Sequence, residues 1–469
     1  MLKLKRYREA IFTCVLDFLI LLTGWFFFHS TYSGELDVLL RFFDLNMNTG
    51  GLVLSAYWIV IFVLSGLYKK LYLVSRLDEF LKVSKATIAG GLILFFLIST
   101  EDTTQFMHQK TTILTYCMVI FLSIGSNRFI IRTIQKIYAQ RGKGLHRSLI
   151  IGTGSSAKYA YDDLLRNKTL GMQVLGFVQV NGKALDPDVG IAEDEILGHL
   201  DNIEHIISDH QVQDILVAIE PKRRKDLVHV ISKIDYPDVT LKLLPDFYQL
   251  VHGLNKTNQI FGLPLIEVSP EPMALWERVV KRLFDLSIAL VVLVVLSPIW
   301  LIVSIFVRTT SSGPAIYQQR RVGKNGKEFV MYKYRTMYED AESRTGPMWA
   351  QENDPRITKL GYWLRKLRID EIPQLINVLK GEMSLVGPRP ERLHFVNKFK
   401  TQIPLYQRRL RVRPGITGWA QVKWKYDTSL DDVKEKTKYD LFYVENMSLK
   451  MDLKILINTV MTVLKGKGQ

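Results

Sequence analysis

Cysteine is scarce in this chain, and its scarcity excludes two classes of protein. The 469 residues contain two cysteines, Cys14 and Cys117, which both lie in apolar runs. Two separated cysteines cannot form a zinc cluster, and they give no sign of a disulfide framework. The sequence also lacks a motif that reads nucleic acid. Its formal net charge of +16 therefore points to membrane lipids or phosphorylated small molecules as partners, with no nucleic acid.

A cleavage site is also absent after the first apolar run, residues 10–28, so we expect this run to be retained as a membrane span. Uncharged runs at residues 45–68, 86–100 and 111–127 follow it. Basic residues precede the first and third runs and follow the second and fourth, so they all fall on one side. This pattern predicts a membrane protein whose residues 1–135 form a four-helix transmembrane bundle with both ends in the cytoplasm. The short third run also suits a buried helix of a soluble domain, although acidic residues at its far end favour a span.

Residues 136–250 have the pattern of a Rossmann-like α/β domain on the cytoplasmic side. Buried strands are predicted at several places, and helical patterns separate most of them. This alternation predicts a doubly wound parallel sheet. The predicted strands cover residues 148–151, 174–178, 214–219 and 240–244.

A GxGxxA turn begins at Gly152, directly after the first of these strands, and is typical of dinucleotide sites. Two partners of such a site are missing. Asn181 stands near the place where an acidic residue would bind the ribose, and the segment has no Tyr-x-x-x-Lys pair. We therefore expect a structural or regulatory domain rather than a redox site. Residues 251–275 are predicted to be a linker to the charged C-terminal third, residues 276–469.

An uncharged run at residues 286–307 has basic residues on both flanks and a Ser-Pro step in its middle. The run is long enough to span a membrane. The basic flanks favour a re-entrant helix instead, which breaks at the proline and leaves the membrane on the side it entered. The residues that we assign to this element are Lys281, Arg282, Asp285, Ser297 and Pro298.

Two adjacent carboxylates, Asp370 and Glu371, stand just before a short predicted helix. Pro373 suits the first turn of this helix, and Gly381 suits its end. The positive end of the helix dipole would then help to keep both acids ionised. A pair of acids at a solvated helix start is the ordinary alternative, so the surrounding cations decide between the two interpretations.

The cations near these acids are placed so that they can converge. An Asn-Gly hairpin signal precedes a strand on which two cations are two residues apart and so share a face. Two arginines three residues apart share a helical face, and a further arginine stands between two prolines. One carboxylate can attack a phosphorus atom or hold a metal while the cations neutralise phosphate oxygens. The candidate phosphate ligands are Lys333, Arg335, Arg365, Arg368 and Arg389.

Six short motifs follow one another in the C-terminal third, at residues 281–285, 297–298, 333–337, 370–374, 387–390 and 413–419. In this order and spacing, they resemble the bacterial sugar transferase family, the polyprenyl-phosphate hexose-1-phosphate transferases. The predicted spans and the Rossmann-like segment are similar to the long members, such as the undecaprenyl-phosphate glucose phosphotransferases of exopolysaccharide biosynthesis. The resemblance implies an α-rich monotopic catalytic domain at residues 276–469.

The resemblance also implies a reaction. A sugar 1-phosphate would pass from a UDP-sugar to undecaprenyl phosphate with release of UMP, which starts an exopolysaccharide, capsule or O-antigen repeat unit. Asp370 would be the nucleophile that forms a phosphosugar–aspartate, and Glu371 would hold Mg²⁺. Arg413 is a further phosphate ligand and Asp440 a supporting residue. The protein would lie in the bacterial inner membrane with its catalytic domain in the cytoplasm, and a homodimer is left open.

Two other classes of function stay open beside this one. One is a nucleotide-sugar oxidoreductase or epimerase that uses the Rossmann-like domain, which the missing Tyr-x-x-x-Lys pair disfavours. The other is an inactive membrane scaffold, which the intact Asp370-Glu371 pair disfavours. The sequence does not name the transferred sugar, and glucose or galactose is our expectation from the long members of the family.

Overall fold

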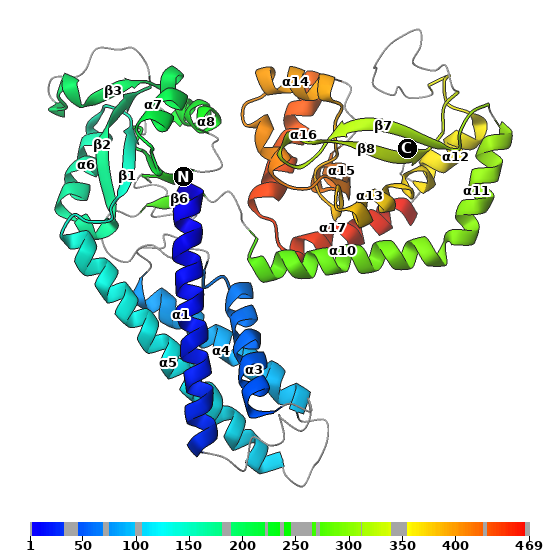
Figure 1. Cartoon of the computed structure of the whole chain (residues 1–469). Coiled ribbons are helices and arrows are strands. Elements are labelled where there is room, and N and C mark those ends of the chain that lie inside the picture. Colours follow the sequence, from blue (N-terminus) through cyan, green and yellow to red (C-terminus); the bar gives the residue numbers. More distant parts are fainter. Residues whose placement is uncertain are drawn as a thin grey trace. The chain divides into compact units, whose positions relative to one another are not determined.

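A computed structural model of the chain divides into two compact units, Met1–Ser269 with Ala274–Trp276 and Pro270–Met273 with Glu277–Gln469 (Figure 1). Each unit is described on its own. The described residues are 2–31, 46–68, 75–98, 106–180, 189–220, 224–234, 239–244, 265–268, 273–310, 312–338, 354–424 and 429–464. Asn181 and most of the predicted linker lie outside them.

The first unit begins with helices that are apolar on most of their surface. Among the described residues, three stretches are long and apolar enough to cross a membrane, at Ala10–Thr31, Arg76–Leu97 and Thr111–Gln140. Helix α3 has 18 residues and is apolar but shorter than these three. The structure thus supports three of the four expected spans by length and composition. The helices are α1 (Leu2–Thr31), α3 (Met47–Leu64), α4 (Arg76–Ile98) and α5 (Phe106–Gln140).

A buried polar cluster joins these helices. The carboxylate of Asp17 on α1 is paired with Arg128 on α5 and accepts a hydrogen bond of 2.8 Å from the Tyr68 hydroxyl. Glu79 on α4 accepts from Arg132 on α5 at 3.0 Å. All four charged side chains are at most 4% exposed. Each acid therefore has a cation beside it inside the bundle. This agrees with the rule that charged residues within membrane-spanning helices are paired.

The Rossmann-like sheet follows α5 after a short turn. Its strand order is β3-β2-β1-β4-β5-β6, and all pairs are parallel except β5 with β6. Helix α6 packs on one face, and α7 and α8 pack on the other. The predicted parallel sheet is confirmed, while β3 and β6 were not predicted and β6 lies within the predicted linker. The elements are β1 (His146–Ile151), α6 (Ser155–Arg166), β2 (Met172–Gln179), β3 (Ile196–His199), α7 (Ile203–Asp209), β4 (Asp214–Val217), α8 (Arg224–Lys233), β5 (Thr240–Leu243) and β6 (Ile266–Val268).

The second unit is rich in helices, and its described residues form two small sheets, β7 with β8 and β9 with β10. One apolar core joins α10, α13, β8, β9, α16 and α17. Its helices are α10 (Leu275–Val295), α11 (Ser297–Thr310), α12 (Lys359–Lys366), α13 (Gln374–Lys380), α14 (Leu393–Gln402), α15 (Trp419–Lys423), α16 (Leu430–Glu445) and α17 (Leu449–Leu464). Its strands are β7 (Ile316–Val322), β8 (Glu328–Tyr334), β9 (Ser384–Val386) and β10 (Gly415–Thr417).

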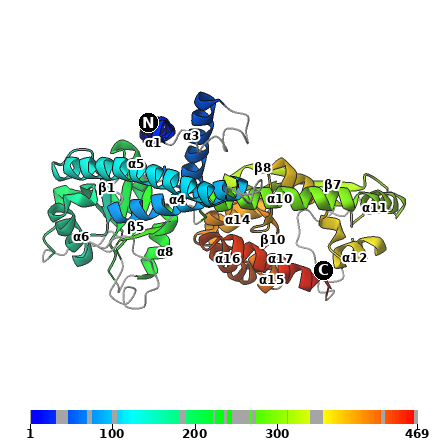
Figure 2. The ribbon, with the colours of Figure 1, turned by 90° about the horizontal axis from the view of Figure 1, so that it is seen from below.

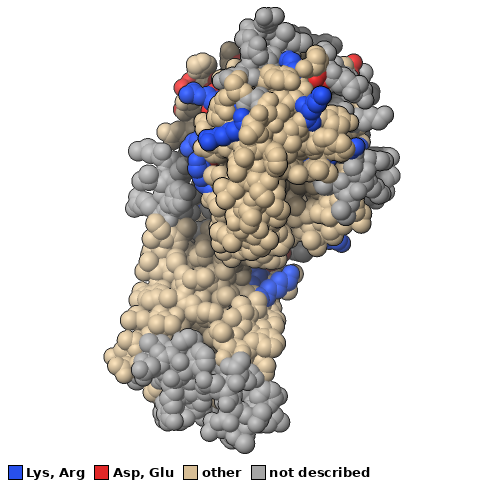
Figure 3. Space-filling model, turned by 90° about the vertical axis from the view of Figure 1, so that its right-hand side faces the viewer, with Lys and Arg blue, Asp and Glu red and all other residues tan. Residues whose placement is uncertain are grey.

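Helices α10 and α11 form a bent pair along one edge of this unit (Figures 1 and 2). The bend is 65°, and it falls between Val295 and Ser297, at the predicted Ser-Pro break. Large apolar side chains are exposed along both arms, among them Leu290, Val294 and Ile305. Figure 3 views the end of the unit where α11 lies, and uncharged residues form a continuous area there. Many exposed large apolar side chains on one helix pair are typical of a surface that contacts a membrane or a partner.

Both arms of the bent pair are attached to the core of the same unit. On α10, the three charged residues of the predicted membrane element bind backbone and side chains of the core, and one of them caps the C-terminal carbonyls of α13. On α11, the Trp300 carbonyl accepts from the Tyr334 hydroxyl at 3.0 Å. The α10 contacts are Lys281 to Asp452 (2.5 Å) and the Val386 carbonyl (3.2 Å), Arg282 to the carbonyls of Val378 (2.7 Å) and Leu379 (3.1 Å), and Asp285 to Ser384 (2.7 Å) and the Leu385 amide (3.2 Å).

Candidate active site

The β7–β8 hairpin positions Lys333, one of the predicted phosphate ligands, beside the acids. Its turn has Asn325 and Gly326 with φ angles of 58° and 77°, so the Asn-Gly prediction is confirmed. The strands pair without a register shift from Ile316–Tyr334 to Val322–Glu328. Because side chains alternate along a strand, this register fixes the face on which Lys333 lies.

Helix α12 packs closely against the end of β8, and a glycine permits this. A Cβ atom on Gly361 would lie 2.1 Å from the Thr336 carbonyl oxygen, so no larger residue fits. The Thr358 hydroxyl caps the helix by accepting from the Gly361 amide. One turn later, the Arg365 Nε donates to the Thr336 hydroxyl at 2.9 Å. The predicted ligand Arg365 is therefore held against β8, directly before the acidic pair.

The two acids lie in a 3₁₀ turn, Ile369–Glu371, between α12 and α13. Arg368 precedes the turn in the left-handed region, with φ 57°. This backbone conformation is costly for a residue with a Cβ, by about 1 kcal/mol or more. Arg368 and Glu371, which are three residues apart, contact each other across this turn.

Three cations meet on one oxygen of Glu371. Its Oε1 lies 3.1 Å from Arg389 Nη2 and 3.4 Å from both Lys333 Nζ and Arg368 Nη1. Although burial raises the pKa of Glu371, the charges of Arg389, Lys333 and Arg368 outweigh it and hold this pKa well below its usual range. Glu371 is therefore ionised at neutral pH and works as the anchor that gathers these cations.

Asp370 is in a different position from its neighbour. It is 7% exposed, and its Oδ1 has no hydrogen-bond partner among the described residues. Burial, followed by the charge of Glu371, raises the pKa of Asp370 to about 6. A buried carboxylate oxygen without a partner is costly and calls for an explanation. A carboxylate with a raised pKa, an oxygen without a hydrogen-bond partner and cations beside it could act as a nucleophile or as a metal ligand.

Arg409, together with Asp440 on α16, holds the loop that carries Arg389. The Nη2 atom of Arg409 donates to the Arg389 carbonyl at 2.8 Å and also lies 2.8 Å from the carboxylate of Asp440. Both Arg409 and Asp440 are at most 4% exposed. Asp440 thus supports the site through Arg409 without touching the acids.

Two of the predicted phosphate ligands have other positions. Arg335 is buried and donates to the Val307 carbonyl at 3.3 Å, so it ties the end of β8 to α11. Arg413 is exposed, and it lies close enough to Arg282 for the two charges to interact. These positions correspond to helix attachment for Arg335 and a surface location for Arg413.

Comparison with known proteins identifies the family to which these features belong. The family model described as bacterial sugar transferase matches residues 276–466. The UDP-glucose:undecaprenyl-phosphate glucose-1-phosphate transferase of Escherichia coli is 30% identical over 331 residues, which are 70% of this chain and 69% of that protein. The chain belongs to the bacterial sugar transferase family. The family predicted from the six motifs is therefore confirmed.

Two other relatives show how far the similarity of this sugar transferase extends. The UDP-glucose:undecaprenyl-phosphate glucose-1-phosphate transferase of Xanthomonas campestris is 28% identical and covers 93% of the chain and 96% of its own length. The UDP-N-acetylgalactosamine-undecaprenyl-phosphate N-acetylgalactosaminephosphotransferase of Aeromonas hydrophila is 44% identical over 40% of the chain and 44% of its own length. A second family model, described as CoA-binding domain, matches residues 63–245.

Sequence reasoning missed two residues near the acids of this sugar transferase. Arg321 and Gln374 line a small cavity together with Lys333 and Arg389. Gln374 was part of a recognised motif but had no assigned role. Arg321 follows Arg320 on β7, and the alternation of a strand requires one of the two to point inward. Which one does so depends on the pairing with β8, so the sequence alone could not tell.

The glycine turn of the Rossmann-like domain holds a carboxylate of its own. Glu220 follows β4, at the point between β1 and β4 where the strand order reverses and where ligands bind in such sheets. Its Oε1 accepts from the Ser155 amide at 3.2 Å and from the Ser155 hydroxyl at 3.3 Å. A Cβ atom on Gly154 would lie 2.3 Å from the same oxygen. An internal anion therefore occupies the place where a pyrophosphate would bind the α6 N-terminus.

The acidic pair fits a magnesium ion only together with a phosphorylated substrate. Among the described residues, no group of three or more His, Cys, Asp or Glu side chains could hold a metal. Mg²⁺ is usually bound by one or two carboxylates plus substrate phosphates and water. Asp370 and Glu371 supply such a pair, and the open Oδ1 of Asp370 is a suitable donor.

Proposed function

We propose that this sugar transferase moves a sugar 1-phosphate from a UDP-sugar to undecaprenyl phosphate, with release of UMP. The observation that carries the proposal is the buried Oδ1 of Asp370, which has no hydrogen-bond partner among the described residues and lies beside the cations that contact Glu371. The relatives named above act on UDP-sugars and undecaprenyl phosphate, which supports the substrate class. The product would start an exopolysaccharide, capsule or O-antigen repeat unit.

The proposed chemistry has two steps. An oxygen of Asp370 attacks the sugar-bearing phosphorus of the donor, and UMP leaves with the electron pair of the broken P–O bond. The phosphate of undecaprenyl phosphate then attacks the same phosphorus, and the carboxylate of Asp370 is regenerated. Lys333, Arg365 and Arg389 neutralise the phosphate oxygens. These three cations lie close to Asp370, because their charges lower its pKa and partly offset the rise that burial causes.

Magnesium belongs to this proposal as a partner of the donor. Glu371 would hold it with Asp370 or a donor phosphate, and bound Mg²⁺ supplies charge neutralisation on the diphosphate. Because three cations already contact Glu371, we expect the metal to bind with the diphosphate rather than before it.

The direct test of the proposed function is UMP release. Purified protein with undecaprenyl phosphate and Mg²⁺ is offered UDP-glucose, UDP-galactose, UDP-N-acetylglucosamine and UDP-N-acetylgalactosamine. The relatives include glucose and N-acetylgalactosamine transferases, so the panel decides the sugar. Release of UMP with none of these donors would favour the inactive scaffold.

We also propose that α10 and α11 form a re-entrant hairpin and that the catalytic unit lies on the cytoplasmic side. Both arms bind the core of one unit, which supports entry and exit on the same side. Cysteines placed at Ala274 and Lys324, with Cys14 and Cys117 replaced by serine, are expected to resist a membrane-impermeant maleimide in intact cells and to react in inverted vesicles. Opposite behaviour of the two positions would mean that the pair spans the membrane.

The bend itself has a matched test. Replacing Pro298 by Leu restores a backbone N–H and removes the ring that opposes a straight helix. We expect the catalytic unit to be misplaced and UMP release to fall, whereas Ile299→Leu leaves the break intact and should act as the native chain. Equal activity of the two variants would show that Pro298 is not needed for the bend.

We further propose that the Rossmann-like domain has no redox role. The carboxylate of Glu220 at the glycine turn opposes a second anion there. We expect purified protein to carry less than stoichiometric NAD or NADP, and UMP release to continue when nucleotide is removed by dialysis. A full equivalent of NAD or NADP, or activity lost on its removal, would favour the oxidoreductase or epimerase.

A further inference from the structure

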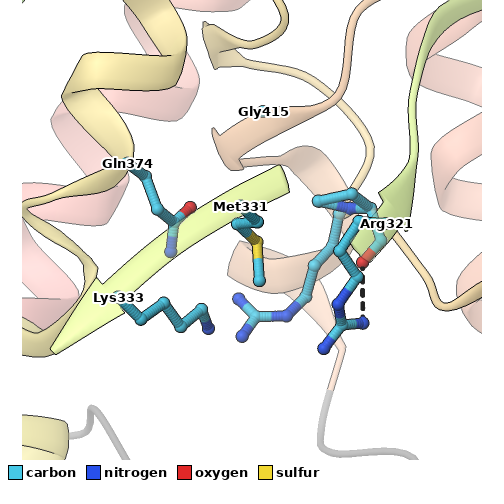
Figure 4. Close-up of a pocket in the computed structure, with 7 residues that line it drawn as sticks. Arg321, Met331, Lys333, Gln374 and Gly415 are labelled. Atoms are coloured by element: carbon cyan, nitrogen blue, oxygen red, sulfur yellow. Dashed lines mark hydrogen bonds between the residues drawn. The ribbon is translucent and has the colours of Figure 1, made fainter. Parts of the chain in front are cut away.

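A small cavity beside the acidic pair is lined by cations and not by the acids. The side chains of Arg321 and Lys333 extend toward it from the two strands of the β7–β8 hairpin (Figure 4). Among the described residues that line it, three are cations and none is acidic. The lining residues are Arg321, Met331, Lys333, Gln374, Arg389, Pro390 and Gly415.

These cations are held in place from outside the cavity. Lys333 and Arg389 contact Glu371, as described above. Arg321 donates to the Pro390 carbonyl at 3.1 Å and lies 3.6 Å from Glu391. The side chain of Lys333 is 17% exposed, that of Arg389 is 31% exposed and that of Arg321 is 18% exposed. Their positive groups are therefore fixed and largely shielded from water, as an anion site requires.

Burial adds a reason for an anion to bind here. It lowers the pKa of Arg321 to about 10. An anion in the cavity would stabilise the charged form of Arg321. Glu371 and Glu391, which pair with these cations, are not among the described residues that line the cavity.

We propose that the cavity binds the nucleotide-side phosphate of the donor, which leaves as the phosphate of UMP, and that Arg321 is one of its ligands. The inference rests on the proposed function. Lys333 and Arg389 both contact Glu371 and line the cavity. They therefore connect the place where Asp370 attacks the donor with the place from which UMP leaves. Arg321 also lines the cavity, but its ion-pair partner is Glu391.

The bond changes agree with this assignment. In-line displacement places the leaving oxygen on the side of the phosphorus opposite the attacking carboxylate of Asp370. The bond from Asp370 to the sugar-bearing phosphorus forms while the bond from that phosphorus to the bridging oxygen breaks. The electron pair stays on the bridging oxygen, which becomes an oxygen of the UMP phosphate. Negative charge thus grows at the leaving phosphate, where a fixed guanidinium is most useful.

Product inhibition tests the role of Arg321. We expect Arg321→Gln to raise the inhibition constant of UMP by about 10- to 100-fold, as the loss of a hydrogen bond to a charged group does. Arg321→Lys should recover part of this loss. Arg320→Gln is the matched control, because the side chain of Arg320 is 83% exposed on the other face of β7, and it should leave the constant unchanged. Inhibition by uridine, which has no phosphate, should be equal in all of them.

The outcomes separate this inference from the proposed function. If the native protein releases UMP but Arg321→Gln loses only turnover, with native UMP inhibition, the cavity is not the leaving-phosphate site. If only the KM for undecaprenyl phosphate rises, the cavity belongs to the acceptor and the inference is overturned. Failure of the native protein to release UMP from any UDP-sugar would instead count against the proposed function.

Discussion

Replacing Asp370 by Asn is expected to abolish turnover, with a loss on the order of 10⁴-fold or more, as removal of a covalent nucleophile does in other enzymes. The amide keeps the shape of the side chain but cannot attack phosphorus. Glu371→Gln is the neighbouring comparison, and we expect a loss of about 10²-fold with a weaker response to Mg²⁺, because the anchor of three cations becomes neutral. UMP release and intact mass after incubation with the UDP-sugar measure both effects.

The native protein offers a second measure of the same nucleophile. The ionised form of Asp370 attacks, and its pKa is raised to about 6, so the rate of the first step should fall as the pH drops through about 6. A phosphosugar adduct on Asp370→Asn would contradict the assignment of the nucleophile. So would a first-step rate that stays constant well below pH 6.

Replacing Asp440 by Ala is expected to cost about 3–5 kcal/mol of unfolding free energy, because it leaves the buried guanidinium of Arg409 without its counterion. The same change releases the Arg389 carbonyl from a fixed partner, so the KM for the donor should rise. Asp431→Ala on the same helix is the matched control. Its side chain is 86% exposed and pairs with Lys434, so the expected cost is below about 0.5 kcal/mol.

Thermal unfolding of the detergent-solubilised protein compares these variants. The double variant Asp440→Ala with Arg409→Met should recover part of the lost stability, because the unpaired buried charge is then absent. The KM for the donor should stay high in the double variant, since Arg409 no longer holds the loop. An Asp440→Ala midpoint equal to that of Asp431→Ala would mean that the buried pair contributes little.

The local signals in the sequence predicted the elements that depend on neighbouring residues. The Asn-Gly turn, the Ser-Pro break and the adjacent acids each occur where the pattern placed them, because turn geometry, a missing N–H and covalent adjacency act within a few residues. The parallel sheet was predictable from its alternation of strands and helices. Strands β3 and β6 were not predicted, since β3 contains a glycine, which strands disfavour, and β6 has only three residues.

Contacts between distant parts of the chain bring the cations of the site to the acidic pair. Glu371 meets Lys333 from 38 residues away and Arg389 from 18 residues away, and neither distance follows from local spacing. The same long-range packing directed Arg335 to α11 and brought Glu220 to the glycine turn. The sequence by itself thus determined the family, most of the elements and the acidic pair. Only the tertiary structure decided which cations reach that pair, because the direction of a side chain depends on strand pairing and helix docking.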